Sequence, residues 1–398
     1  MHSCLKNWLG MNFINLFKTM WNSKTYSIIC MIAGLSLSAC VPPGNTVSRD
    51  VRIELMSGFP DGESGYDLGG SGCYAGKLGD FLIMAGGCNF PDKPLSEGGV
   101  KRYYKGIYAA RVNDSSVLHW VKVGKLPVEA AYGATVSLPD RLIFIGGSNS
   151  SSQLSSVLSF SFDCMKELSV TCEVLPSLPC TLDNMSATLL GDTLYVLGGY
   201  KDGIPSCSMF SFCLNNYSGR WTEDLLPGKP RVQPVCASLL GDLYIWGGFI
   251  PGKESSVLTD GLCYLSASGQ WKVLKAPLTT EGQPLTLTGG TSVSYGDSLI
   301  ICAGGVNRDI FEDAISGSYK KVCESEYLLQ PAEWYHFNDQ LLAYDVRSGE
   351  WTRIGTPSPM LARAGASLVL FGEALFYIGG ELKPGIRTSD ICRIFFQE

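Results

Sequence analysis

One short loop near the end of the chain carries a carboxylate and an arginine where similar loops carry neither. Six apolar segments end in a Gly-Gly pair, and in five of them an uncharged residue follows: Cys88, Ser148, Tyr200, Phe249 or Val306. In the sixth, GGELKPGIRT, the residue is Glu381, and Arg387 follows six positions later. Between them, Pro384 fixes φ and Gly385 accepts positive φ, which predicts a type II turn over Lys383-Pro384-Gly385-Ile386. The chain then doubles back and brings the two charged side chains together.

A carboxylate beside an arginine is suited to acid–base chemistry on an anionic substrate. The carboxylate of Glu381 can accept a proton as a general base. The planar fork of Arg387 can bind a substrate carboxylate through two parallel hydrogen bonds, which a lysine could not reproduce. The same spacing also suits a plain ion pair on a surface hairpin, which contributes little to stability. On spacing alone, both interpretations stay open.

Other polar and aromatic residues are weaker candidates for substrate binding. Asn307 and Arg308 lie just after another Gly-Gly pair, where ordinary loop polarity is the alternative. Arg363 precedes an apolar run, so it either points into a central channel or caps a sheet. Four residues could hydrogen-bond or stack on a sugar, or instead pack between sheets: Lys101, Tyr103, Tyr104 and Tyr132.

Six repeats must position these residues. Each contains an apolar segment that ends in a Gly-Gly pair: FLIMAGG, LIFIGG, LYVLGG, LYIWGG, LIICAGG and LFYIGG. Most follow a tight turn signal such as Gly191-Asp192 and an earlier apolar run, which indicates a β-hairpin. A polar loop, a third apolar stretch and often a tryptophan come next. Four short strands per unit resemble the kelch repeat, and six units predict an all-β, six-bladed kelch-type β-propeller over residues 51–398.

The two ends of this region explain how such a ring could close. The last repeat supplies ASLVL, LFYIGG and DICRIFF and is then one strand short. The segment VRIELM at residues 51–56 precedes the first repeat. We therefore expect residues 51–56 to form the outer strand of the last blade, which would remove the exposed edges of an open sheet.

Composition and residue pattern exclude some classes of function. The 398 residues are 45% hydrophobic and carry a formal charge of −6. The body has no run of Lys and Arg, which argues against a nucleic-acid surface and favours a small or neutral-to-acidic partner. His119 and His336 lie in different repeats, and no two cysteines have CxxC spacing. A copper oxidase of the kelch type would need paired histidines, so we expect chemistry that needs neither a metal nor another cofactor.

The N-terminal segment reads as an export signal. Lys24 precedes an apolar run over residues 27–37, which is too short for a permanent membrane-spanning helix. The run ends in LSAC, which resembles the lipobox of bacterial lipoproteins and implies lipid on Cys40. We expect a signal peptide over 1–40, a linker over 41–50, and a lipid-anchored protein in the periplasm or outer membrane of a bacterium.

Export makes disulfides chemically possible among the 15 cysteines. Cys164 with Cys172, and Cys207 with Cys213, are close enough in sequence to pair. Spacing alone does not decide the connectivity.

Three segments resemble the bacterial N-acetylneuraminate epimerases, also called sialic acid mutarotases. They are GGVNRDIF with the later EWYHF, AGGCNFPDKP with SEGGVKRYYKGIY, and GGELKPGIRT. The GE-x-KPG-x-RT element is the most specific. In the typical family member this element is central and the EGG-x-K element follows it, whereas here EGG-x-K comes first. The chain thus resembles a cyclically permuted branch, which a ring of blades tolerates because each blade contacts mainly its neighbours.

The resemblance implies a function. It implies a cofactor-independent isomerase that interconverts the anomers of N-acetylneuraminate or a related sialic acid, with Glu381 as proton acceptor. We assign Arg387 to the substrate carboxylate. The alternative is a non-catalytic glycan- or protein-binding propeller at the cell surface, which has no need of a general base.

Overall fold

The computed structural model describes residues 50–162, 168–216 and 219–396. The predicted signal peptide, the lipid site at Cys40 and the linker up to residue 49 lie outside these ranges, as does Cys164. Within them the fold is all-β, with many antiparallel four-stranded sheets. None of the helices in this part of the chain is long and apolar enough to cross a membrane.

Six four-stranded sheets occur in the described residues; five are each built from one sequence repeat, and the sixth combines the last repeat with residues 51–56. From inner to outer strand, the first three are β2 (Tyr74–Leu78), β3 (Phe81–Ala85), β6 (Gly106–Arg111), β7 (Trp120–Lys125); β8 (Ala134–Ser137), β9 (Leu142–Ile145), β10 (Val157–Phe162), β11 (Val170–Leu175); and β13 (Ser186–Leu190), β14 (Thr193–Leu197), β17 (Ser208–Cys213), β18 (Thr222–Leu225). The other three are β19 (Val235–Leu239), β20 (Asp242–Trp246), β23 (Gly261–Leu265), β24 (Gln270–Leu274); β25 (Thr291–Tyr295), β26 (Leu299–Ala303), β27 (Leu341–Asp345), β28 (Glu350–Ile354); and β29 (Ser367–Phe371), β30 (Ala374–Ile378), β33 (Ile391–Phe396), β1 (Val51–Met56).

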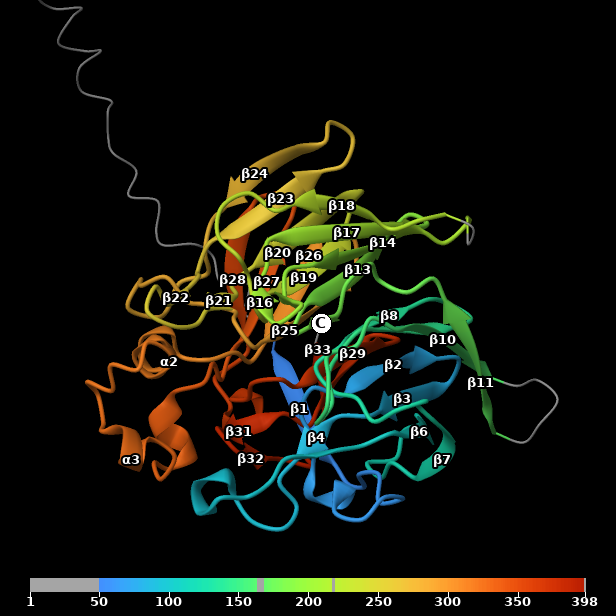
Figure 1. Ribbon diagram of the computed structural model, residues 1–398, viewed down its shortest axis with the longest axis horizontal. Helices are drawn as coiled ribbons and strands as arrows, with labels where there is room; N and C mark the ends of the chain where they lie inside the picture. Colours follow the sequence, from blue (N-terminus) through green and yellow to red (C-terminus); the bar gives the residue numbers. More distant parts are fainter. Residues whose placement is uncertain (1–49, 163–167, 217–218, 397–398) are drawn as a thin grey trace, which may run out of the picture. The chain divides into compact units, whose positions relative to one another are not determined.

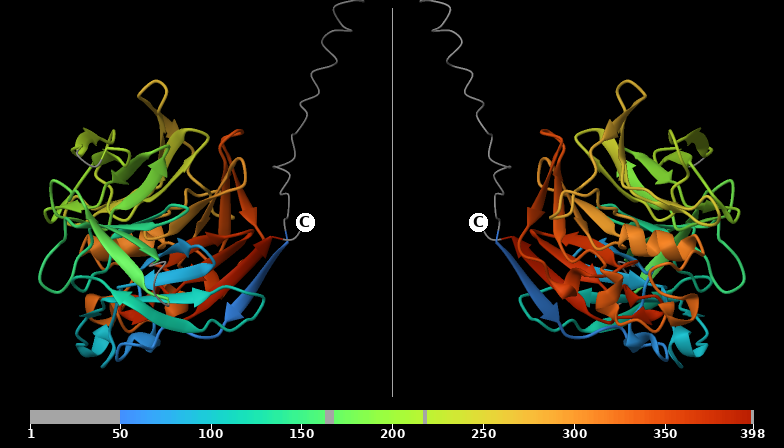
Figure 2. Two further views of the ribbon diagram at one scale, coloured as in Figure 1. Left: turned by 90° about the vertical axis from the view of Figure 1, so that its right-hand side faces the viewer. Right: turned by 90° about the vertical axis from the view of Figure 1, so that its left-hand side faces the viewer.

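The sixth sheet joins the two ends of the described chain. β1 lies antiparallel to β33, with Val51 opposite Phe396 and Met56 opposite Ile391. Figure 2 shows the blue first strand beside the red last strand. Arg393 of β33 also donates a hydrogen bond of 2.8 Å from Nη2 to a carboxylate oxygen of Glu54 on β1. Strand pairing and a partly buried ion pair thus hold β1 in this sheet.

The hydrophobic core lies between neighbouring sheets, which pack face to face. All four residues of β9 are buried. Leu142 and Phe144 pack toward the first sheet, whereas Ile143 and Ile145 pack toward the third. Side chains alternate along a strand, so a strand covered on both faces must be apolar at every position. This explains why the Gly-Gly segments read as continuous apolar runs.

The inner strands contact one another in a closed order. β2 contacts β8, and the contacts continue through β13, β19, β25 and β29 back to β2. Figure 1 shows these strands around a common centre. Phe376 of the sixth sheet packs with Met84 of the first sheet. A hydrophobic core therefore lies between these two sheets, as it does between the other pairs of neighbouring sheets.

Six residues, each two positions before an inner strand, form what we call the mouth ring: Gly72, Tyr132, Asn184, Gln233, Gly289 and Gly365. The backbone N–H of each donates to the carbonyl oxygen of the member before it, at 2.7 to 3.1 Å, and Gly72 completes the circle by donating to Gly365. All six have positive φ, between 52° and 71°. Three members are glycines, whereas Tyr132, Asn184 and Gln233 hold side chains in a region that non-glycine residues rarely adopt.

A channel begins at the mouth ring. Its first part, of about 210 Å³, is lined by ring members and by the first residues of the inner strands. A wider part, of about 870 Å³, follows and shares Thr135 and Ser292 with the first. Most lining side chains are small, so the centre of the molecule is open and the core lies between the sheets.

Shorter elements occupy the connections. They are the strands β4 (Cys88–Asn89), β5 (Arg102–Tyr103), β12 (Leu182–Asp183), β15 (Tyr200–Lys201), β16 (Ile204–Pro205), β21 (Phe249–Ile250), β22 (Ser256–Val257), β31 (Glu381–Lys383) and β32 (Ile386–Arg387), and the helical turns η1 (Tyr66–Leu68), η2 (Leu95–Glu97) and η4 (Pro359–Leu361). The longest connection, between β26 and β27, contains α2 (Arg308–Ile315), α3 (Glu324–Tyr327) and η3 (Ala332–Tyr335). We call this connection, residues 304–340, the insert; Figure 1 shows it in orange.

The Cys207–Cys213 disulfide that the sequence allowed does not form. Both thiols are free. Cys207 precedes β17 and Cys213 ends it, so the two residues lie about 20 Å apart along an extended strand. A disulfide requires Cα atoms within about 7 Å of each other.

Candidate active site

The loop that follows the sixth Gly-Gly pair lies beside the mouth ring. Glu381 exchanges two backbone hydrogen bonds with Ala364, at 2.7 and 3.0 Å, and Ala364 adjoins the ring member Gly365. Gly380 precedes Glu381 with φ of 101°. A Cβ at Gly380 would lie only 2.8 Å from the Cβ of Ala366. Glycine is therefore needed here both for the backbone conformation and for the close approach that holds Glu381 at the mouth.

Glu381 and Arg387 form an ion pair across a short hairpin. They lie opposite each other in β31 and β32, joined by a turn in which Gly385 has φ of 84°. Arg387 Nη1 donates to Glu381 Oε1, and the Gly385 N–H donates to the same oxygen at 2.8 Å. No described residue donates a hydrogen bond to Oε2. The Glu381 side chain is 25% exposed, whereas that of Arg387 is 4% exposed. The hairpin thus presents one free carboxylate oxygen.

Arg387 stays cationic despite its burial. Burial, the largest single effect, lowers its pKa, but the charge of Glu381 together with the neighbouring Tyr132 and Cys88 outweighs burial and the pKa is raised. Its Nη2 lies 3.4 Å from the phenol oxygen of Tyr132. Its Nε is buried and has no hydrogen-bond partner among the described residues.

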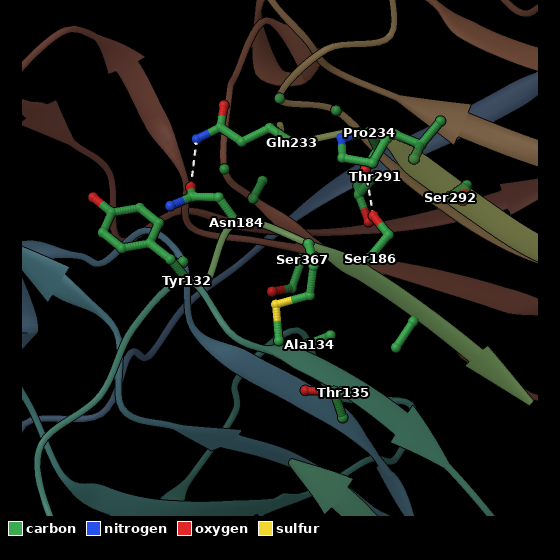
Figure 3. Close-up of a pocket in the computed structure, with 18 of the residues that line it drawn as sticks. Tyr132, Ala134, Thr135, Asn184, Ser186, Gln233, Pro234, Thr291, Ser292 and Ser367 are labelled. Carbon is green, nitrogen blue, oxygen red and sulfur yellow. Dashed lines mark hydrogen bonds between the residues drawn. The ribbon is translucent and has the colours of Figure 1, made fainter. Parts of the chain in front are cut away.

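Tyr132 connects this ion pair to the mouth ring. Its phenol oxygen accepts a hydrogen bond of 3.2 Å from Lys101 Nζ, and Cys88 Sγ lies 3.1 Å away. Burial, followed by the proximity of Cys88, raises the pKa of Tyr132, so the phenol is protonated at neutral pH. In Figure 3, Tyr132 lies next to Asn184 and Gln233 at the mouth of the channel.

These residues line one pocket of about 430 Å³, within the range of small-molecule sites. Its lining residues are Phe90, Leu95, Gly99, Lys101, Tyr132, Glu381, Pro384, Gly385 and Arg387. Two cations and one carboxylate give the lining a net positive charge. The apolar side is supplied partly by Phe90, whose ring centre lies 5.3 Å from the Arg387 guanidinium. Such a pocket suits a small anion that also has hydroxyl groups.

Arg363 does not line this pocket and instead supports it from within the protein. It is 1% exposed, and its Nη1 donates to the carbonyls of Gly379 and Asp390 at 3.0 and 2.8 Å. Arg231 repeats the arrangement in the fourth repeat, where Nη1 donates to the Gly247 carbonyl at 2.7 Å. The sequence left open whether Arg363 points into a central channel or caps a sheet. In the structure it caps the sixth sheet. An arginine that satisfies these buried carbonyls holds the Gly-Gly turn in place.

Asn307 and Arg308 also lie outside the pocket lining. Asn307 caps α2, because its side-chain oxygen accepts the backbone N–H groups of Asp309 and Ile310, both at 3.1 Å. Arg308 Nε pairs with the carboxylate of Asp309 at 2.8 Å. Both residues serve the start of a helix, so the structure does not bring them together with Glu381 and Arg387.

The insert contacts the Glu381 hairpin through Lys383. Lys383 Nζ donates to the carbonyls of Leu328 and Gln330, at 3.2 and 2.6 Å. Burial, and after it the charge of Glu381, raise the pKa of Tyr335 to about 12. Lys383 therefore ties the insert to the hairpin and adds no free charge to the pocket.

Comparison with known proteins agrees with these motifs. A family model described as N-acetylneuraminate epimerase matches residues 175–398, more than half of the chain. The protein belongs to this family. N-acetylneuraminate epimerase of Haemophilus influenzae (strain 86-028NP) is 32% identical over 234 residues, covering 56% of this chain and 59% of the relative. N-acetylneuraminate epimerase of Salmonella enteritidis PT4 (strain P125109) is 29% identical over 231 residues, covering 55% and 57%. The chain thus spans slightly less than three fifths of the length of these relatives.

Sequence reasoning did not single out four residues in or beside this pocket. Phe90, Leu95 and Gly99 line it, and Cys88 Sγ lies 3.1 Å from the phenol oxygen of Tyr132. Cys88 occupies the position after the first Gly-Gly pair, equivalent to that of Glu381, so the repeat pattern itself could have identified it. In the described ranges, no group of three or more His, Cys, Asp or Glu residues could hold a metal ion.

Proposed function

We propose that this protein is a cofactor-independent epimerase that interconverts the anomers of N-acetylneuraminate or a related sialic acid. The observation that carries the proposal is the Glu381–Arg387 pair, which presents a free carboxylate oxygen to a pocket with a net positive lining. The relatives named for this activity support the choice of substrate class.

The substrate carboxylate would bind between Lys101 and Arg387. Both side chains reach the phenol oxygen of Tyr132, so their charges converge at one place in the pocket. Arg387 is almost fully buried and already pairs with Glu381, so it offers mainly Nη2 to a ligand. Lys101 then supplies the second charge. The anionic end of the sugar would be held by charge-assisted hydrogen bonds from two sides.

Glu381 would act as the base. Arg387 and the Gly385 N–H hold Oε1, so Oε2 is free to take the proton of the anomeric hydroxyl. As the carbonyl forms, the bond from the anomeric carbon to the ring oxygen breaks and the ring oxygen takes up a proton. Rotation of the open chain and closure on the other face of the carbonyl give the second anomer, and Glu381 returns its proton.

We further propose that residues 51–396 form one six-bladed β-propeller closed by the pairing of β1 with β33. The closed order of inner strands, the hydrogen-bonded mouth ring and the core between the sixth and first sheets support this proposal. The family match begins at residue 175 and runs to the last residue, while the EGG-x-K element lies before it. This favours the cyclically permuted order of blades.

Export and lipid anchoring through Cys40 remain part of the proposal, and they rest on the LSAC motif. Mass spectrometry of the mature protein tests them. We expect cleavage before Cys40 and an acyl mass on that residue; an uncleaved, unmodified N-terminus would contradict the idea.

NMR of anomer exchange tests the activity. Freshly released α-N-acetylneuraminate is added to the purified protein, and the conversion to the β-anomer is followed against the uncatalysed rate. We expect a large acceleration that needs no added metal or cofactor. If the protein binds sialic acids or glycans without accelerating exchange of any acidic sugar, the binding-propeller alternative replaces this proposal.

A further inference from the structure

The phenol of Tyr132 has an unusual set of hydrogen-bond partners. A phenol oxygen has two lone pairs and one proton. Lys101 Nζ and Arg387 Nη2, at 3.2 and 3.4 Å, are donors only, so they occupy the lone pairs. The third neighbour, Cys88 Sγ at 3.1 Å, is a weak donor to the same oxygen, so no described residue accepts the phenol proton. The Tyr132 proton is therefore available to an oxygen atom in the pocket.

The backbone holds this phenol in one place. Tyr132 has φ of 59°, a conformation that a tyrosine keeps only where its surroundings enforce it. The mouth ring does so, because the Tyr132 N–H donates to Gly72 at 2.9 Å and its carbonyl accepts from Asn184 at 2.8 Å. Among the described residues, Tyr132 is also the one that is common to the linings of the Glu381 pocket and the channel mouth. The mouth ring thus fixes the backbone from which the phenol reaches the Glu381 pocket.

We propose that Tyr132 is the general acid that protonates the ring oxygen, as the partner of Glu381. This inference rests on the proposed function. The substrate carboxylate, the anomeric hydroxyl and the ring oxygen are all attached to the same carbon. A carboxylate bound between Lys101 and Arg387 therefore brings that carbon to the phenol of Tyr132, with Glu381 across the Arg387 guanidinium.

The step balances without any other reactant. Glu381 takes the proton of the anomeric hydroxyl, and the O–H electron pair forms the carbonyl. The bond to the ring oxygen breaks, its electrons stay on that oxygen, and the oxygen takes the proton of Tyr132. On closure the ring hydroxyl returns its proton to the phenolate, while protonated Glu381 gives its proton to the former carbonyl oxygen. Protein and substrate end with the protons they began with.

The surrounding charges suit both states of the phenol. Burial raises its pKa, so the free protein holds the proton ready for donation. The positive charge of Arg387 lowers the pKa of the phenol. Lys101 is also positively charged, so both cations stabilise the phenolate as it forms. An apolar pocket without these cations would hold the proton too firmly.

Tyr132→Phe tests the inference, because it removes the proton and keeps the ring. We expect kcat for anomer exchange to fall by about 10²- to 10⁴-fold, with KM and the affinity for N-acetylneuraminate changed by less than about threefold. Tyr200→Phe is the control: Tyr200 follows a Gly-Gly pair outside the mouth ring, and its phenol contacts neither Lys101 nor Arg387. We expect the control to match wild type.

The outcomes separate this inference from the proposed function. Wild type that does not accelerate exchange overturns the proposed function itself. Wild type that is active, with Tyr132→Phe within about threefold of it in kcat, overturns only the role of Tyr132. An equal loss in affinity and in kcat/KM, with kcat kept, assigns the phenol to binding alone and also overturns it.

A second variant covers the case in which Tyr132→Phe does not fold. Ring-fluorinated tyrosine at position 132 keeps the hydroxyl and lowers the pKa of the phenol, while the surrounding Lys101, Arg387, Cys88 and Glu381 are unchanged. We expect the high-pH limb of the kcat profile to move to lower pH. A profile that coincides with that of wild type would overturn the inference.

Discussion

The fourth and sixth repeats build the same turn and use it differently. In both, a buried arginine donates to the first carbonyl of the Gly-Gly pair, Arg231 to Gly247 and Arg363 to Gly379. In both, the residue after the pair exchanges two backbone hydrogen bonds with the residue that follows the arginine. In the fourth repeat that residue is Phe249, which is 8% exposed and packs with other apolar side chains.

In the sixth repeat the equivalent residue is Glu381, whose side chain is 25% exposed and lines a pocket. The Gly-Gly turn therefore holds the residue after it in a fixed backbone position. The type of that residue decides whether its side chain packs in the core, as Phe249 does, or lines a pocket, as Glu381 does. Both repeats continue into a short hairpin, but β21–β22 places Val257 opposite Phe249, whereas β31–β32 places Arg387 opposite Glu381. The fourth repeat has no charged pair at this position in the part of the chain that the structure describes.

The sharpest test of this difference is Glu381→Gln. The amide keeps the size and hydrogen-bonding capacity of the carboxylate but cannot act as a base, so exchange of the N-acetylneuraminate anomers should fall by about 10²- to 10⁴-fold. Calorimetric titration should show that binding is largely kept. Exchange as fast as that of wild type would show that Glu381 is not the base.

Arg387→Lys should have the next largest effect. Lysine keeps the charge but loses the planar fork that contacts both Glu381 and Tyr132. The loss of one charge-assisted hydrogen bond, about 1.5–3 kcal/mol, corresponds to a fall in kcat/KM of about 10- to 100-fold. Steady-state rates from NMR measure it. If kcat/KM stays at the wild-type value, a point charge is sufficient and the geometric role of Arg387 is wrong.

The two buried arginines provide a matched pair for stability. Arg231→Leu and Arg363→Leu should each lower the free energy of unfolding by about 1–3 kcal/mol, because each leaves a Gly-Gly carbonyl unsatisfied. Urea denaturation measures this loss. Of the two, Arg363→Leu alone should also slow exchange, since it loosens the turn that carries Glu381. Equal activity of both variants would show that the turn does not position the carboxylate.

Lys383→Met should have the smallest effect. The side chain keeps its length but no longer donates to the carbonyls of Leu328 and Gln330. We expect a loss of stability of about 0.5–1.5 kcal/mol and faster hydrogen exchange in the insert. Lys253→Met, in an exposed turn, is the control. Unchanged hydrogen exchange in the insert would contradict the idea that Lys383 ties it to the hairpin.

Local sequence was sufficient for the strands and for the central pair of charges. The alternation of apolar runs, Gly-Asp turns and Gly-Gly pairs indicates hairpins because strand and turn preferences act over a few residues. Glu381 and Arg387 are six residues apart, with Pro384 and Gly385 between them, so one turn type predicts their contact. The roles of Lys101 and Tyr132 were open, because an aromatic residue in this fold can equally pack between sheets.

Sequence by itself determined the repeats, the hairpins and the charged loop, because each depends on residues within one repeat. Tertiary structure alone decided what meets that loop. Arg387 contacts Tyr132 across 255 positions of the chain, and no local preference encodes such a contact. Only the folded chain shows that Arg363 faces the carbonyls of Gly379 and Asp390. A buried guanidinium must satisfy its hydrogen bonds wherever acceptors lie, and their positions exist only once the sheets have packed.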